Sequence, residues 1–339
     1  MPRFFTHNQS QHLKITHQVL LGMAVIVVGL GAYTRLKHAG LGCPDWPKCY
    51  QNWLVHPNIT APALSQEATM KAWIEMIHRY IAGLLGLGVL ALRQQYHQKK
   101  APCTRLNITL GIIVLQAVFG MWTVTWRLHP IAVMPHLIGG ITITTLLYLD
   151  YFKKFKNTTP IFFADQIQPK LKILWSLCVI QIITGGWTSA NYAALVCPDF
   201  PTCQGHWVTS MDHIIQGFSL PIGHLTYEGG VLSGEARIAI HIVHRIGALL
   251  CTLMLLHTCY AVFSNSHKLN SLYLFRFNCI VSTFSLQIAL GVSNVIWKLP
   301  IITAVGHNLM ALALIIQLTQ VITQEKLQNS VTHHVIYPA

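Results

Sequence analysis

Long apolar runs alternate with short polar segments along the whole chain. A helix that spans a membrane needs about 20 mostly apolar residues, and eight runs reach that length. They lie at 15–35, 72–92, 106–126, 132–152, 171–191, 238–262, 273–296 and 302–322. The pattern therefore predicts an all-α polytopic membrane protein with eight transmembrane helices.

The connections between these runs differ greatly in length. Only "RLHPI" separates the third run from the fourth, and only "KLPI" separates the seventh from the eighth. Each of these pairs is expected to form a tight helical hairpin. The first-to-second and fifth-to-sixth connections are long, and each contains a pair of cysteines.

Composition agrees with a membrane protein. Hydrophobic residues make up 53% of the 339 residues and charged residues only 10%, whereas soluble domains carry about 25% charged residues. The net charge of +13 does not indicate a nucleic-acid partner, which would need Lys and Arg clustered on one face. Here the basic residues form short clusters between the apolar runs, so membrane lipid is the expected surrounding.

The basic clusters also predict the orientation. The N-terminus, the C-terminus and the segments 93–105, 153–172 and 266–276 hold 14 of the 23 Lys and Arg residues. Cytoplasmic loops carry the excess of Lys and Arg, so we expect both termini in the cytoplasm and both cysteine loops on the periplasmic side. No cleavable signal and no transit peptide is recognised, which favours the inner membrane of a bacterium.

The chain is predicted to be an internal duplication, because residue matches keep constant offsets. The two halves, 1–160 and 161–339, would form tandem four-helix bundles of the same orientation. The matches have offsets of 154, then 166, then 171: Cys43/Cys197, Cys49/Cys203, Thr34/Thr188, Trp53/Trp207; His78/His244; Gln116/Gln287, Gly120/Gly291, Trp126/Trp297, His136/His307.

Four histidines occupy duplicated positions and are the candidate ligands. His78 and His136 lie at similar depth in the first half, as His244 and His307 do in the second. Two imidazoles that face each other across a helical bundle are the arrangement of a bis-histidine haem. A single membrane histidine can instead serve only to hydrogen-bond a neighbouring helix. Zinc is disfavoured because no Cys or carboxylate completes a tetrahedron.

Charged neighbours of the histidines distinguish the two halves. Glu75 lies three residues before His78, on the same helix face, and its counterpart in the second half is His241. A carboxylate beside one haem only predicts chemistry in the first half and electron storage or relay in the second. Arg79 and Arg245 follow the candidate ligands directly. They are expected either to pair haem propionates or to reach the lipid head groups.

The cysteine loops "CPDWPKC" and "CPDFPTC" have a spacing that fits neither a zinc site nor a C-x-x-C redox motif. On the oxidising side of a membrane, Cys43–Cys49 and Cys197–Cys203 are predicted disulfides. Both are read as structural staples, with a redox role as the alternative for Cys43–Cys49. A motif Q-x3-G recurs at Gln116, Gln181 and Gln287, and it indicates close helix packing.

Several stretches together resemble the haem A synthase family: "GAYTRLKHAGLGCPDWPKC", "EMIHRYIAG", "CPDFPTCQGHW", "HIVHRIGAL" and "VGHNLMAL". The resemblance covers nearly the whole chain. It implies oxidation of the C8 methyl group of haem O to a formyl group by successive hydroxylations, for haem–copper terminal oxidases. The outward cysteine pairs match one branch of this family.

The resemblance also implies the roles of the two halves. The second half would hold a permanent haem b through His244 and His307. The first half would take haem O, the substrate, between His78 and His136, with Glu75 required for catalysis. Haem O synthase is then an expected partner, while the electron acceptor and any homo-oligomer are left open. The alternative is a non-enzymatic dihaem electron carrier of the membrane, which would need both halves to bind haem alike.

Overall fold

The computed structural model describes residues 6–55, 65–155, 167–220, 222–223 and 225–336. The described part is helical and contains no strand beyond two isolated bridges in the cysteine loops. Its helices are α1 (His7–Leu36), α2 (Gln66–Gln98), α3 (Thr104–Thr125), α4 (Pro130–Phe155), α5 (Ile167–Ala190), α6 (Met211–Phe218), α7 (Gly234–Ser264), the short η1 (Ser266–Lys268), α8 (Ser271–Ile296) and α9 (Ile301–Ile336).

Local sequence signals begin these helices. A side-chain oxygen just before a helix accepts a hydrogen bond from an otherwise unpaired N–H of the first turn. Thr6 does this for α1 in a capping box with Gln9, and Ser65 and Ser233 cap α2 and α7. Pro130 opens α4, where its missing N–H costs nothing. Single residues therefore mark where α1, α2, α4 and α7 begin.

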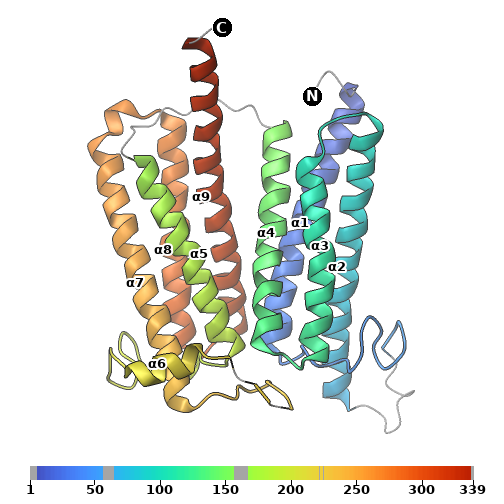
Figure 1. Ribbon diagram of the computed structural model, residues 1–339, viewed down its shortest axis with the longest axis vertical. Helices are drawn as coiled ribbons and strands as arrows, with labels where there is room; N and C mark the ends of the chain where they lie inside the picture. The colour runs from blue at the N-terminus through green and yellow to red at the C-terminus, as the bar shows by residue number, and fades with distance from the viewer. Residues whose placement is uncertain (1–5, 56–64, 156–166, 221, 224, 337–339) are drawn as a thin grey trace.

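The long helices form two bundles side by side, α1–α4 in one and α5, α7, α8 and α9 in the other (Figure 1). The bundles meet where α1 and α4 contact α5 and α9. Both chain ends lie at one end of the molecule, and both cysteine loops lie at the other (Figure 1). The predicted boundary between residues 160 and 161 lies outside the described residues.

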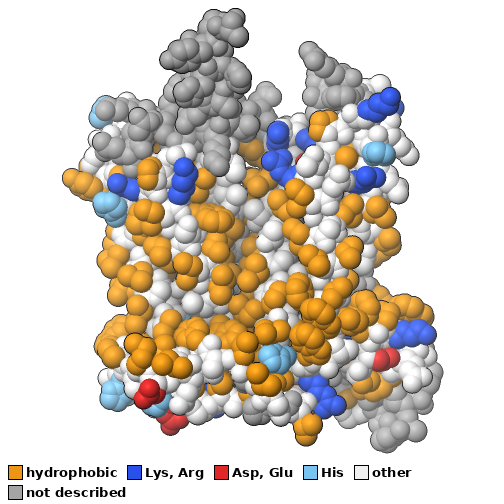
Figure 2. All heavy atoms as spheres, viewed as in Figure 1, with side chains coloured by type: hydrophobic (Ala, Val, Ile, Leu, Met, Phe, Trp, Pro, Cys, Tyr) orange, Lys and Arg blue, Asp and Glu red, His pale blue; other side chains and the backbone are white. Residues whose placement is uncertain are grey.

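Eight of the helices are long and apolar enough to cross a membrane, which confirms the predicted number of spans. Figure 2 shows a broad belt of hydrophobic side chains around the bundles, with charged side chains gathered toward the two ends. The helices extend beyond the predicted runs at most ends, because capping residues and polar turns continue them past the apolar stretch. The sequence did not predict α6, which lies across the loop end of the second bundle (Figure 1).

The two predicted hairpins are formed by equivalent turns. Arg127 and Leu128 after α3 have positive φ angles of 47° and 65°, and Lys298 and Leu299 after α8 have 56° and 64°. The N–H of Leu128 donates to Thr123 O and that of Leu299 to Asn294 O, each at 2.8 Å. These residues end each helix in the left-handed backbone conformation, which glycine adopts most readily.

Well-packed apolar cores occupy the terminus-bearing end of each bundle. In the first bundle Leu13, Leu92 and Leu106 are fully buried, and in the second Leu171, Tyr273 and Leu318 are. In a membrane such packing is driven by van der Waals contact rather than by exclusion of water. The loop end of each bundle is hollow instead, and it holds the candidate site.

Candidate haem sites

Each of the four predicted ligands faces a glycine on a neighbouring helix. A Cβ built on that glycine would lie 2.9–3.3 Å from the Cε1 atom of the imidazole, closer than a methyl group normally packs. Only glycine therefore leaves room for each ring at its present position. The four pairs are Gly31/His78, Gly120/His136, Gly185/His244 and Gly291/His307.

The sequence analysis missed these glycines as site residues. The available signal was the Q-x3-G motif, in which Gly120, Gly185 and Gly291 are the glycines. It was interpreted as helix packing, whereas the close approach in the structure is between glycine and an imidazole.

The first pair of histidines has the spacing of two ligands to one metal. The ring centroids of His78 and His136 are 6.3 Å apart, with an angle of 70° between the ring planes. Metal–imidazole bonds of roughly 2 Å on opposite sides of one ion place the ring centres about 6 Å apart. The Nδ1 atoms of both rings are buried without a hydrogen-bond partner among the described residues.

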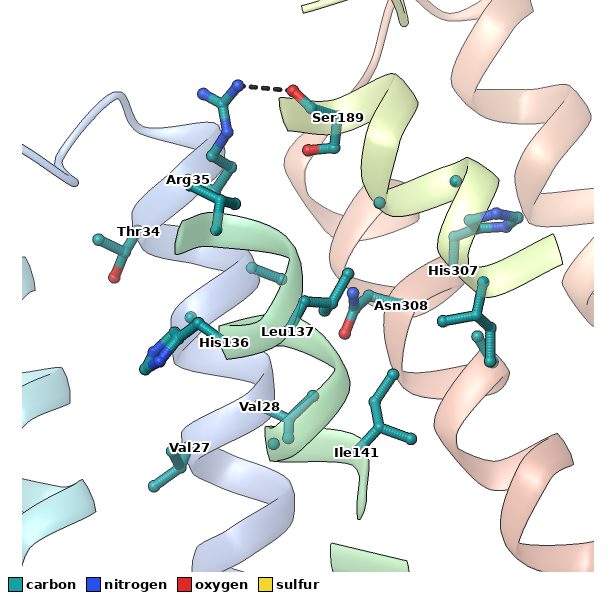
Figure 3. Close-up of a pocket in the computed structure, with 18 of the residues that line it drawn as sticks. Val27, Val28, Thr34, Arg35, His136, Leu137, Ile141, Ser189, His307 and Asn308 are labelled. Carbon is teal, nitrogen blue, oxygen red and sulfur yellow. Dashed lines mark hydrogen bonds between the residues drawn. The ribbon is translucent and has the colours of Figure 1, made fainter. Parts of the chain in front are cut away.

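A single cavity of about 1580 Å³ is lined by all four histidines. It runs through both bundles and across their interface, where Figure 3 shows His136 and His307 on opposite sides of Leu137 and Ile141. In the described part of the chain, no three His, Cys, Asp or Glu side chains cluster to hold a bare metal ion. Pairs of histidines in a large apolar cavity instead fit a metal already held by a macrocycle.

Glu75 lies in the same cavity and is firmly held. Its side chain is only 6% exposed. One carboxylate oxygen accepts a hydrogen bond from the Cys43 N–H at 2.9 Å, and the other accepts from Arg79 Nη2 at 2.5 Å. The equivalent residue in the second bundle, His241, is also buried, with its Nδ1 unpartnered among the described residues. The difference between the halves is thus a buried charge.

The two arginines after the ligands hold the cysteine loops. Arg79 Nη1 donates to the carbonyl oxygens of Asp45, Pro47 and Lys48. Arg245 likewise donates to carbonyl oxygens of Pro201 and Thr202. Both side chains also line the cavity, so contact with haem propionates stays a prediction.

The two cysteine loops have the same internal structure. The sulfurs of Cys43 and Cys49 are 2.05 Å apart, and those of Cys197 and Cys203 are 1.96 Å apart. In each loop an aspartate between the cysteines accepts two backbone N–H bonds, as in Tyr50 N to Asp45 at 2.6 Å.

In the second loop the Thr202 hydroxyl, with the N–H groups of Gly205 and Gln204, holds the pKa of Asp199 well below its usual range. These hydrogen bonds favour the charged form. The support that this carboxylate gives the loop is therefore present at neutral pH, and it is lost only as the pH falls below the ordinary aspartate range.

Both histidines of the second pair have hydrogen-bond partners. His307 Nδ1 lies 3.0 Å from the Gln287 carbonyl oxygen, to which it donates when protonated, and the Gln287 amide lies 3.2 Å from Nε2. His244 Nδ1 lies 3.0 Å from the Gln181 amide and 3.1 Å from the Thr184 hydroxyl. The Q-x3-G motif therefore supplies polar partners as well as close packing.

Polar contacts join the two halves at the loop end, among them one from the end of α1. Arg35 at the end of α1 donates to the Ser189 carbonyl oxygen of α5 at 2.6 Å (Figure 3). Its guanidinium carbon also lies 3.7 Å from the ring centre of Tyr192. Sequence reasoning gave no reason to expect Arg35 here, because its equivalent position in the second half is Ser189 itself.

Comparison with known proteins agrees with this geometry. A family model described as cytochrome oxidase assembly protein, COX15-CtaA, matches residues 15–319. The chain belongs to the COX15-CtaA family. Membership confirms the resemblance that the sequence motifs indicated.

Among relatives in this family, a haem A synthase from Shewanella oneidensis is 40% identical over 321 residues, covering 90% of this chain and 94% of that protein. Haem A synthases from a Wolbachia of Brugia malayi and from Halalkalibacterium halodurans are 28% and 27% identical, each over 86% of this chain. The similarity to COX15-CtaA proteins thus extends over both bundles.

Proposed function

We propose that this protein is a haem A synthase, an oxidoreductase that converts the C8 methyl group of haem O to a formyl group by successive hydroxylations. The observation that carries the proposal is the pair of buried histidine sites in one cavity, in a chain 40% identical to a haem A synthase over 90% of its length. The product serves haem–copper terminal oxidases.

The first bundle binds haem O, and the second holds haem b. His78 and His136 are the ligands to the substrate, and His244 and His307 are the ligands to the cofactor. When bound, haem b supplies one-electron transfer within the cavity. The division is supported by Glu75, since among the described residues only the first bundle places a carboxylate in the cavity beside its histidines.

Glu75 is the catalytic residue of this proposal. Loss of two electrons and a proton from the substrate methyl leaves a carbocation-like centre, and a fixed carboxylate stabilises that positive charge or accepts a proton from incoming water. The Cys43 N–H and Arg79 hold one oxygen each, so the carboxylate has a fixed position before substrate arrives. A buried carboxylate without such partners would be costly.

The membrane orientation follows from the charge distribution. Both termini face the cytoplasm and both cysteine loops face the periplasm of a bacterial inner membrane, because most Lys and Arg residues lie on the terminus side. A haem O synthase in the same membrane supplies the substrate. The two bundles descend from an internal duplication, which the matching hairpins and loops support.

The test is the conversion itself. The protein is expressed with a haem O synthase in a host that lacks haem A, and the extracted haems are separated. Wild-type protein should yield haem A, and Glu75→Gln should reduce the yield at least tenfold. Glu67→Gln, an exposed acid on the same helix, is the matched control and should behave as wild type.

Wild-type extracts with haem b and haem O but no haem A would contradict the proposal. The non-enzymatic dihaem electron carrier would then be the better supported function. That alternative has no use for Glu75, the buried carboxylate of the first site.

A further inference from the structure

The polar surroundings of His244 have no counterpart around His78. In the second bundle, Gln181 and Thr184 of α5 lie against His244 Nδ1 at 3.0 and 3.1 Å. Positions 154 earlier on α1 are Val27 and Leu30. Neither side chain can form a hydrogen bond, and His78 Nδ1 is buried without a partner in the described part of the chain.

A third position also differs between the two bundles. The Gln181 side chain lies on Gly247 of α7, where a Cβ would come within 2.2 Å of its Oε1 atom. Only a glycine leaves that space. The equivalent position on α2, at an offset of 166, is Ile81. The first bundle therefore has neither a counterpart of the Gln181 amide nor the space that Gly247 leaves for it.

The contacts also fix the orientation of His244. Gln181 Nε2 donates to the His244 backbone oxygen at 2.8 Å, which ties α5 to α7 beside the ring. The Thr184 hydroxyl donates to the Gln181 backbone oxygen at 3.0 Å, so its own oxygen is available to accept the Nδ1 proton. The Gln181 amide is a donor and cannot accept that proton, so its part is the bond to the His244 backbone oxygen. Nε2 of the imidazole is then left with the lone pair that a metal takes.

A hydrogen bond to the distal nitrogen of a ligating histidine fixes the ring and makes it a stronger ligand. Loss of such a partner typically lowers metal affinity by about 10–100-fold. A permanent cofactor needs the stronger ligand. A haem that enters as substrate and leaves as product needs a ligand that releases it.

We infer that Gln181 and Thr184 make the second site a haem-retaining site, and that Val27, Leu30 and Ile81 make the first site a haem-releasing site. This inference rests on the proposed function for the identity of the two haems. The five residues act through His244 and His78, and they are positioning residues rather than catalytic ones. They set the rate at which each haem dissociates from its site.

The test measures haem loss from purified protein to excess apomyoglobin. Gln181→Val with Thr184→Leu gives the second site the surroundings of the first, and haem b should leave about 10–100-fold faster. The midpoint potential of haem b should also rise, because a less basic imidazole favours the ferric iron less. Thr184→Ser keeps the hydroxyl and should retain haem b as wild type does.

The reverse exchange keeps the inference testable if the first variant does not fold. Val27→Gln with Leu30→Thr and Ile81→Gly should slow the release of haem O from the first site, whereas Val27→Leu should not. Unchanged release rates and an unchanged potential in folded variants would overturn the inference.

The two proposals fail in different ways. Altered release rates in a protein that makes no haem A would leave the inference standing and remove the function. Haem A formation with unaltered release rates would support the proposed function and overturn the inference.

Discussion

The glycines that face the imidazoles set how closely two helices approach at each ligand. A methyl group at Gly185 would lie 2.9 Å from His244 Cε1, so the ring or the helix has to move. Overpacking of this kind costs about 1–3 kcal/mol. A shift of the ring would move the ligand nitrogen away from the position it holds now.

Gly185→Ala should therefore lower the amount of low-spin haem b in purified protein at least severalfold, as measured by absorption spectroscopy. Gly111→Ala is the control, because a Cβ there meets nothing within 4 Å and Gly111 does not line the cavity. Equal haem content in both variants would show that the ring tolerates the methyl group and that the glycine has no part in ligation.

The sequence predicted the four histidines and Glu75 as site candidates because each lies at a duplicated position or breaks the duplication. It could not predict that Arg79 reaches three loop carbonyls and Glu75. Those contacts depend on the path of the loop over the helix. Spacing along the helix shows that Arg79 and Glu75 are neighbours, but not which loop atoms they meet.

The two cysteine loops differ in what they contact on the helices beneath them. The first loop contributes the Cys43 N–H to Glu75 at 2.9 Å, whereas the second loop has no carboxylate beneath it at the equivalent position, which is His241. The first loop thus supports the proposed catalytic residue directly.

Replacing Cys43 and Cys49 with serine should loosen that loop and release Glu75, so the haem A yield should fall severalfold. The same change at Cys197 and Cys203 should leave the yield closer to wild type, because His241 rather than a carboxylate occupies the equivalent position beneath that loop. Haem extraction from both variants measures this. Equal losses would mean that the loop above Glu75 has no special role.

The helices themselves were the most predictable elements. The lengths of the apolar runs predicted the eight spans, and the short connecting segments predicted both hairpins. The helix α6 was missed because its eight residues are too few for a span and lie in an insertion without a counterpart in the first half. Tertiary context decides such short helices.

At the scale of the whole molecule, both histidine pairs open into one cavity that crosses the interface of the bundles. The interface is apolar around Val28, Leu137 and Ile141, and the Arg35–Ser189 contact lies at its loop end (Figure 3). The duplication predicted two sites, but it could not predict that they share a cavity.

The haem content of two single-ligand variants tests the central claim most directly. His78→Ala and His244→Ala are each purified after expression with a haem O synthase, and the bound haems are extracted and identified. We expect His78→Ala to keep haem b but to lose haem O and haem A, and His244→Ala to lose haem b while the first bundle still binds haem O. Loss of the same haem from both variants would contradict the division of the molecule into a substrate half and a cofactor half.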